Sequence, residues 1–67
     1  MPSPLIPTPA DLVGHYRRFG PFGPVYEIVA VRQALLDGDT LLHVRLPEND
    51  EEVDVRYSQV IQDPEAD

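Results

Sequence analysis

The residues best suited to binding chemistry lie close together in one stretch of the chain, from Gly14 to Tyr26. This stretch holds two adjacent arginines and most of the aromatic residues of the protein. Arginines beside aromatic rings can stack on nucleobases or on the side chains of a protein partner. The pattern therefore indicates four candidate binding residues, Tyr16, Arg17, Arg18 and Phe22.

The same stretch also has a structural interpretation. Tyr16 and Phe19 would then cover the core, and the segment 20–24 would form a stiff corner, because its glycines and prolines disfavour both helix and sheet interior. The two interpretations combine into a first strand followed by a stiff corner. The outward side chains of the two arginines and of Phe22 would form the binding face.

Catalytic and metal chemistry find little support in the sequence. The chain contains no cysteine, which excludes disulfides, thiolate nucleophiles and cysteine-based zinc sites. His15 and His43 do not have a metal-ligand spacing, and Ser58 has no histidine beside it. We interpret both histidines as surface or half-buried residues. The sequence thus predicts no catalytic residue, no metal and no cofactor, and it predicts a protein that is not an enzyme.

An acidic run between Glu48 and Asp54 is the other conspicuous polar feature. It could bind a cation or a basic partner, but it lacks the glycine and the regular oxygen spacing of a calcium loop. A solvated turn is the preferred interpretation.

The length and charge of the chain limit the classes of protein that it can represent. Sixty-seven residues make one small domain, and the formal net charge is −7. Acids dominate residues 48–67, whereas arginines dominate residues 14–35. This balance argues against binding of duplex nucleic acid over the whole surface, and it suits solubility or a basic protein partner.

The two ends of the chain differ in composition from its middle. Residues 1–9 are rich in proline and uncharged, which predicts a flexible N-terminal tail, and residues 63–67 predict an acidic C-terminal tail. The single β domain would span residues 10–62. The N-terminus has neither the basic region of a secretory signal nor the apolar length of a membrane anchor, so we expect a cytoplasmic protein without membrane contact.

Alternating apolar and polar residues predict four short strands, with turns at Asp37-Gly38-Asp39 and Glu48–Glu51 between the later ones. The expected strands are His15–Phe19, Val25–Leu36, Thr40–Leu46 and Glu52–Tyr57. A helical alternative exists for Val29–Leu36, although the β-branched residues before it favour a strand.

Short helical turns are expected near both ends of the chain. Thr8 is placed to cap a turn over Pro9–Val13, and Ser58 to cap another over Ser58–Gln62. Across the second hairpin, Arg45 is expected to pair with Glu52 or Asp54. The predicted fold is mainly β: a small antiparallel meander of about four strands, curled into an SH3-like, partly open barrel with short helical turns near both ends.

The order of these motifs resembles a family of small bacterial proteins of unknown function, from about Gly14 to Ala66. The string that carries most of the resemblance runs Tyr-Arg-Arg-Phe-Gly-Pro-Phe-Gly-Pro-Val-Tyr-Glu from Tyr16, and a weaker element is the ending Asp-Pro-Glu-Ala from Asp63. The resemblance implies a stand-alone bacterial cytoplasmic protein, and it implies no activity.

Three hypotheses on function follow from these features. The first is a non-enzymatic protein-binding or regulatory module, similar to an adaptor or an antitoxin, which fits the acidic charge and the aromatic and arginine-rich stretch. The second is a small barrel that binds single-stranded nucleic acid through Tyr16, Arg17, Arg18 and Phe22, which the overall charge opposes. The third is a homodimer that forms through an open strand edge.

Overall fold

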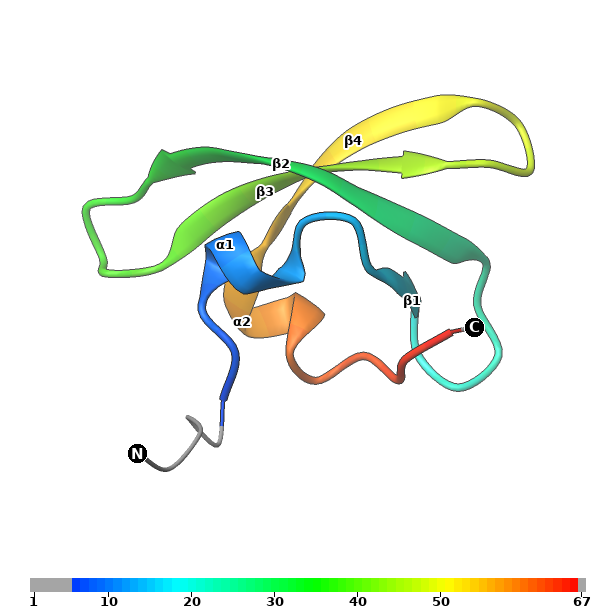
Figure 1. The fold of residues 1–67 in the computed structure, drawn as a ribbon, viewed down its shortest axis with the longest axis horizontal. Helices are drawn as coiled ribbons and strands as arrows, with labels where there is room; N and C mark the ends of the chain where they lie inside the picture. The colour runs from blue at the N-terminus through cyan, green and yellow to red at the C-terminus, as the bar shows by residue number, and fades with distance from the viewer. Residues whose placement is uncertain (1–5, 67) are drawn as a thin grey trace.

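The computed structural model describes residues 6–66 and consists mainly of one antiparallel sheet (Figure 1). Its four strands follow one another in the order β1-β2-β3-β4, and the sheet does not close, so the predicted mainly β meander is confirmed. The elements in chain order are α1 (Pro9–Leu12), β1 (Tyr16–Arg18), β2 (Val25–Ala34), β3 (Thr40–Leu46), β4 (Glu51–Arg56) and α2 (Tyr57–Val60).

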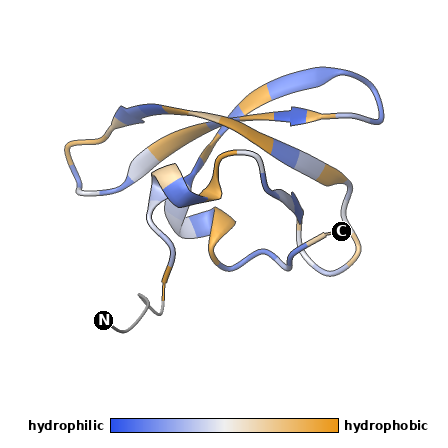
Figure 2. Cartoon of the chain, viewed as in Figure 1, coloured by the Kyte–Doolittle hydropathy of each residue, from blue (hydrophilic) through white to orange (hydrophobic). Residues whose placement is uncertain are grey.

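The core lies between the inner face of the sheet and the two short helices, which both lie on that side (Figure 1). Alternation in the strands turns every second side chain inward, and Ile28, Val44 and Val53 lie side by side across three strands. The helices contribute Leu12 and Val60, both fully buried. In Figure 2 the apolar segments of the strands and of the helices face one another across this space.

The strand β2 leaves the core halfway along its length. Tyr26 and Ile28 are buried, but every residue from Val29 to Ala34 is exposed. Two irregularities in the pairing with β3, at Val29 and at Arg32, mark bulges that change the direction of the strand. The segment is nonetheless a strand as far as Ala34, so the helical alternative for Val29–Leu36 is wrong.

The first predicted helical turn is confirmed and the cap of the second is wrong. Thr8 and Asp11 form a capping box at the start of α1. In contrast, α2 begins at Tyr57, so Ser58 lies within the helix rather than before it. The Ser58 hydroxyl instead donates a hydrogen bond of 2.6 Å to Oδ2 of Asp39.

Charged side chains cover the outer face of the sheet in a pattern that differs from the expected one. Arg45 lies opposite Glu52 in the register, but its ion pairs are with Glu27, at 3.0 Å, and with Asp50, at 3.1 Å. Glu52 instead contacts His43, which lies beside it on the same face of the sheet. The side-chain contact between β3 and Glu52 of β4 is therefore made by a histidine and not by the expected arginine.

Both ends of the described chain contact the domain. At the N-terminal end, the Tyr57 hydroxyl donates a hydrogen bond to the Pro7 carbonyl; residues 1–5 of the predicted tail lie outside the described part. At the C-terminal end, residues 63–66 run antiparallel along β1. The Arg18 N–H donates to the Pro64 carbonyl, and the Ala66 N–H donates to the Tyr16 carbonyl, each at 3.0 Å. Residues 63–66, which the sequence analysis separated from the domain as a tail, thus extend its sheet by a short fifth segment.

Candidate binding loop

The loop between β1 and β2, residues 19–24, presents one aromatic ring to solvent. Phe22 lies at its tip and its side chain is 95% exposed. We call this segment the Phe22 loop. Its base is closed by a hydrogen bond of 3.0 Å from the Phe19 N–H to the Pro24 carbonyl, and Arg18 donates through Nη1 to the Gly23 carbonyl at 3.2 Å. The loop is therefore fixed at its base while its tip is fully accessible.

Gly23 is required for the path of this loop. A Cβ atom at this position would lie 1.9 Å from the carbonyl oxygen of Phe19, which is a backbone atom and has little freedom to move. Phe19 itself packs inward against Tyr26, with ring centroids 4.3 Å apart. Thus one phenylalanine anchors the loop to the core and the other projects from it.

The carboxylate of Asp63 lies beneath the Phe22 loop and is only 4% exposed. It accepts hydrogen bonds from the Gly20 N–H at 3.2 Å, the Tyr26 hydroxyl at 2.7 Å and Nε2 of Gln59 at 3.0 Å. These donors come from the loop, from β2 and from α2, respectively. We call Arg17, Gly20, Tyr26, Gln59 and Asp63 the Asp63 network.

Arg17 supports the same network from within the protein. Its side chain is 9% exposed, and Nη1 donates to the main-chain carbonyl of Asp63 at 2.8 Å. Its Nε is buried and has no hydrogen-bond partner among the described residues. Burial raises the pKa of the neighbouring Tyr26 phenol, and the hydrogen bond to Asp63 raises it further, so this hydroxyl remains a donor.

The structure places three of the four predicted binding residues at the surface and turns the fourth inward. Tyr16 and Phe22 are exposed and Arg18 is half-buried, so these three have atoms at the surface. Arg17 faces inward, against the expectation of an outward guanidinium, because alternation along β1 turns it toward Tyr26 and Asp63. Arg17 thus presents little of its surface to a partner in this conformation.

Sequence reasoning missed the contribution of Asp63, Gln59 and Tyr26 to the loop. From the sequence, Asp63 belongs to the predicted acidic tail and to the ending Asp-Pro-Glu-Ala, neither of which indicates a buried carboxylate. No local pattern marks Asp63 as buried, since its donors lie 4, 37 and 43 positions away along the chain.

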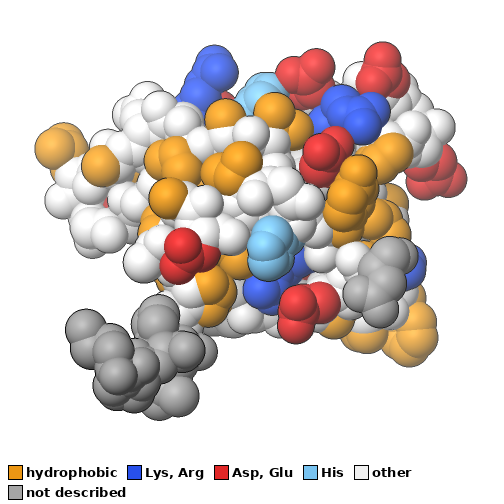
Figure 3. Space-filling view, viewed as in Figure 1, with side chains coloured by type: hydrophobic (Ala, Val, Ile, Leu, Met, Phe, Trp, Pro, Cys, Tyr) orange, Lys and Arg blue, Asp and Glu red, His pale blue; other side chains and the backbone are white. Residues whose placement is uncertain are grey.

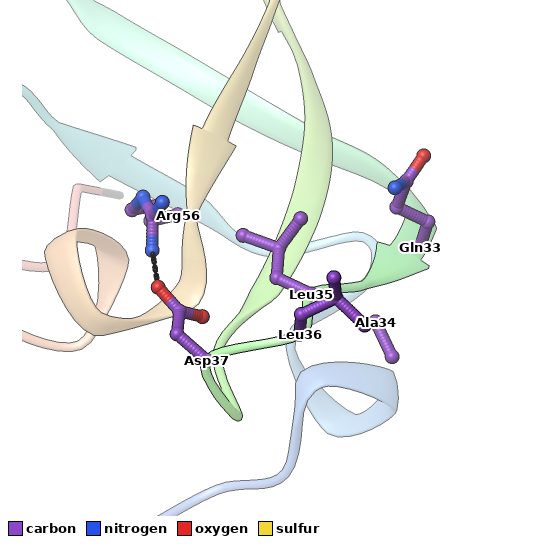
Figure 4. Close-up of a pocket in the computed structure, with 6 residues that line it drawn as sticks. All are labelled: Gln33, Ala34, Leu35, Leu36, Asp37 and Arg56. Atoms are coloured by element: carbon purple, nitrogen blue, oxygen red, sulfur yellow. Dashed lines mark hydrogen bonds and ion pairs between the residues drawn. The ribbon is translucent and has the colours of Figure 1, made fainter.

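A second exposed apolar region lies at the opposite end of the molecule, at the turn between β2 and β3 (Figures 1 and 3). Leu36 is fully exposed there. An open hollow of about 490 Å³ lies beside it, lined by residues 33–37 and by Arg56, whose Nη1 donates to Oδ2 of Asp37 at 2.7 Å (Figure 4). We call Leu35–Asp39 the hairpin tip.

All five arginines of the protein are engaged by groups of their own chain. The partners of Arg17 and Arg18 are main-chain carbonyls of Asp63 and Gly23, while Arg32, Arg45 and Arg56 pair with carboxylates. The charge left unpaired at the surface is thus mainly negative.

His43 forms a further contact with carboxylates of its own chain. Its two ring nitrogens lie 2.8 Å from Oδ1 of Asp54 and 2.6 Å from Oε1 of Glu52. Carboxylates only accept, so both nitrogens donate when the ring is an imidazolium. The hydrogen bond to Asp54, followed by that to Glu52, raises the pKa of His43 above its usual range.

Comparison with known proteins assigns the chain to a family. Residues 4–67 match a family described as "Family of unknown function (DUF5397)". The chain belongs to this family. It is also 38% identical, over 53 residues, to an uncharacterised protein of Haemophilus influenzae; the match covers 79% of this chain and 84% of the relative. The chain thus has a bacterial relative of similar length.

One further observation concerns membranes. Within residues 6–66, neither helix has the length and apolar character needed to cross a bilayer.

Proposed function

We propose that this protein is a non-enzymatic protein-binding module that engages its partner through the Phe22 loop. The observation that carries the proposal is the combination of an almost fully exposed phenylalanine with a backbone fixed on both sides of it. An exposed aromatic ring in water is unfavourable, and a soluble protein gains from covering it. Tyr16 and Arg18, which lie on the same side of β1, supply further aromatic and cationic atoms.

A stiff loop favours binding for an entropic reason. Aromatic side chains that fill a pocket on a partner contribute most of the affinity at many interfaces. The affinity is higher when the loop that carries them does not have to be ordered upon binding. Here the base of the loop, Gly23 and the Asp63 network have already restricted the backbone.

The arginines favour a protein partner over nucleic acid. Binding of single strands requires cationic side chains that follow the phosphate backbone. The five arginines already have partners within the chain, and the net charge is −7. A partner with a basic surface around an apolar pocket complements this protein better than a phosphate backbone does.

We further propose a regulatory role for this protein and a more specific description of its fold. An adaptor-like or antitoxin-like regulator in the cytoplasm of a bacterium would use such a small acidic module. We also propose an SH3-like arrangement for the curled meander, in which the two short helices cover the open side of the sheet.

Photo-cross-linking tests the proposal directly. Phe22 is replaced by photoreactive benzoylphenylalanine in the bacterium that encodes the protein, and the same replacement at Leu36 is the matched control, because both side chains are almost fully exposed. We expect one stoichiometric protein partner to cross-link at position 22 and not at position 36. The partner is then purified and titrated with the unmodified protein and with Phe22→Ala.

The titration has a defined expected result. Loss of an aromatic anchor weakens binding by at least about 30-fold, the equivalent of about 2 kcal/mol. Equal affinity of the Phe22→Ala variant, or cross-links at position 36 alone, contradicts the proposal. A cross-link from position 22 to a second copy of the chain would replace it with the homo-oligomer alternative.

A further inference from the structure

The C-terminal segment 63–66 and the Phe22 loop are joined by hydrogen bonds into one unit. The Asp63 carboxylate accepts a hydrogen bond from the Gly20 N–H in the loop. The Pro64 carbonyl accepts one from the Arg18 N–H, just before the loop. The Ala66 N–H donates to the Tyr16 carbonyl on the same strand. The segment therefore contacts the loop and the strand that leads into it at successive positions.

We propose that Asp63 is a positioning residue for the Phe22 loop, and that docking of segment 63–66 on β1 regulates how Phe22 is presented. The biological consequence rests on the proposed function, because it concerns the same loop. The structural claim stands by itself: the loop is ordered while the segment is docked and loses its order when the segment leaves.

The arrangement of donors explains why the two parts should be released together. A carboxylate that is 4% exposed is stable only because three donors surround it. Departure of the segment would leave the buried Arg17 guanidinium without the Asp63 carbonyl and the Gly20 N–H without an acceptor. Neither segment 63–66 nor the Phe22 loop keeps these hydrogen bonds when the other one moves.

The position of the segment makes it suited to regulation. It forms a single bridge with β1, and it lies at the edge of the sheet. Segments that are held at a sheet edge by few pairings open more easily than the core of a domain. A competing strand from another protein would thus act on Phe22 without touching it.

Amide hydrogen exchange of the unmodified protein provides the first test. The amides of Gly20, Arg18 and Ala66 should exchange with the same opening free energy and the same dependence on denaturant, since one motion exposes all three. The Thr40 N–H, bonded to Oδ1 of Asp39 at the hairpin tip, is the internal control for an independent motion. A Gly20 amide that exchanges independently of the other two overturns the proposal.

A pair of variants provides the second test. Asp63→Ala removes both carboxylate oxygens and thus the acceptor of the Gly20 N–H, whereas Tyr26→Phe removes one donor and leaves the Gly20 contact intact. We expect the amide order parameters of residues 20, 22 and 23 to fall from about 0.85 to below about 0.6 in Asp63→Ala only. Residues 35–39 should not change in either variant.

The outcomes separate this inference from the proposed function. Unchanged order in residues 20–23 of a folded Asp63→Ala variant overturns the positioning role, as does an equal loss of order in Tyr26→Phe. Neither measurement involves a partner. Failure of Phe22→Ala to weaken partner binding would instead overturn the proposed function and leave the coupling of the loop to segment 63–66 in place.

Discussion

The two ends of the molecule both expose apolar side chains, but they are held in different ways. At the Phe22 loop, the surrounding backbone is fixed by the Asp63 network, whose central carboxylate is buried. At the hairpin tip, the turn is held mainly by exposed groups: Arg56 and Ser58 are exposed, and they donate to the exposed Asp37 and the half-buried Asp39. In Figure 3 hydrophobic atoms protrude at both ends of the long axis.

The difference is the reason why we propose Phe22, and not Leu36, as the binding residue. Buried hydrogen bonds to a charged group hold a loop firmly because water does not replace them. Exposed ion pairs contribute little, since water and salt compete with them. An exposed apolar residue on a weakly held turn loses more conformational entropy when it binds. We propose the Phe22 loop as the binding element for this reason, and not because it is more apolar.

The two ends should differ most in the free energy of unfolding that is lost when a glycine is replaced by alanine. Gly23→Ala places a Cβ atom against the Phe19 carbonyl, so we expect a loss of about 2–4 kcal/mol in the free energy of unfolding. Gly38→Ala at the hairpin tip meets no atom within 4 Å, and its φ of +92° accounts for a smaller loss of about 1 kcal/mol. Urea unfolding of both variants measures the difference. Equal losses would show that the path of the Phe22 loop does not depend on Gly23.

Removal of the Tyr26 hydroxyl should have the next largest effect. Its hydrogen bond to Asp63 is buried and has a charged acceptor, so Tyr26→Phe should lower the free energy of unfolding by about 2 kcal/mol. The raised pKa of the phenol adds a dependence on alkaline pH. A group whose folded pKa lies above its unfolded value stabilises fully below about pH 10 and loses this contribution as the pH rises further.

The alkaline part of this prediction can be measured separately. Urea unfolding of the unmodified protein between about pH 8 and about pH 11 should show a steeper loss of stability than that of Tyr26→Phe. Parallel pH profiles would contradict the assignment of the alkaline loss to Tyr26.

The hairpin tip should respond to acid instead, and more weakly. The hydrogen bond from Arg56 lowers the pKa of Asp37, and the one from Ser58 lowers the pKa of Asp39. Lowered folded pKa values mean that this stabilisation is present above about pH 4 and is lost as the pH falls through the folded pKa values. The stability difference between the unmodified protein and Ser58→Ala should therefore shrink on acidification. A difference that is constant down to about pH 2 would show that Asp39 does not titrate with this contact.

The sequence predicted the local features of this fold and missed the contacts that join distant segments. The strand Thr40–Leu46 and the cap at Thr8 follow from patterns a few residues long, and both were predicted correctly. The burial of Arg17 was missed because a charged residue in a short strand is normally exposed, and only its distant partners reveal the exception. The exit of β2 from the core was missed for a related reason, since the apolar residues Val29, Ala30 and Val31 continue the apolar run of the buried part of the strand.

The candidate site shows the same limit. Phe22 and its glycines and prolines were found from composition, since stiff corners have a local signature. The Asp63 network has none, because it requires a β1 strand, a β2 strand and the turn after α2 to meet. The sequence therefore predicts Asp63 as part of an acidic tail rather than as the centre of a buried network.

The smallest effect on stability is expected at the two exposed apolar tips. Leu36→Ser and Phe22→Ser remove side chains that contact little of the protein, so each should change the free energy of unfolding by less than about 0.5 kcal/mol. Their effects on partner binding should nevertheless differ. Phe22→Ser should weaken binding about as strongly as Phe22→Ala, whereas Leu36→Ser should leave it unchanged, because only the Phe22 loop is held in a fixed geometry before binding. Calorimetric titration of the cross-linked partner with both variants measures this. Equal weakening by the two would mean that fixation of the loop is not what selects the binding end of the molecule.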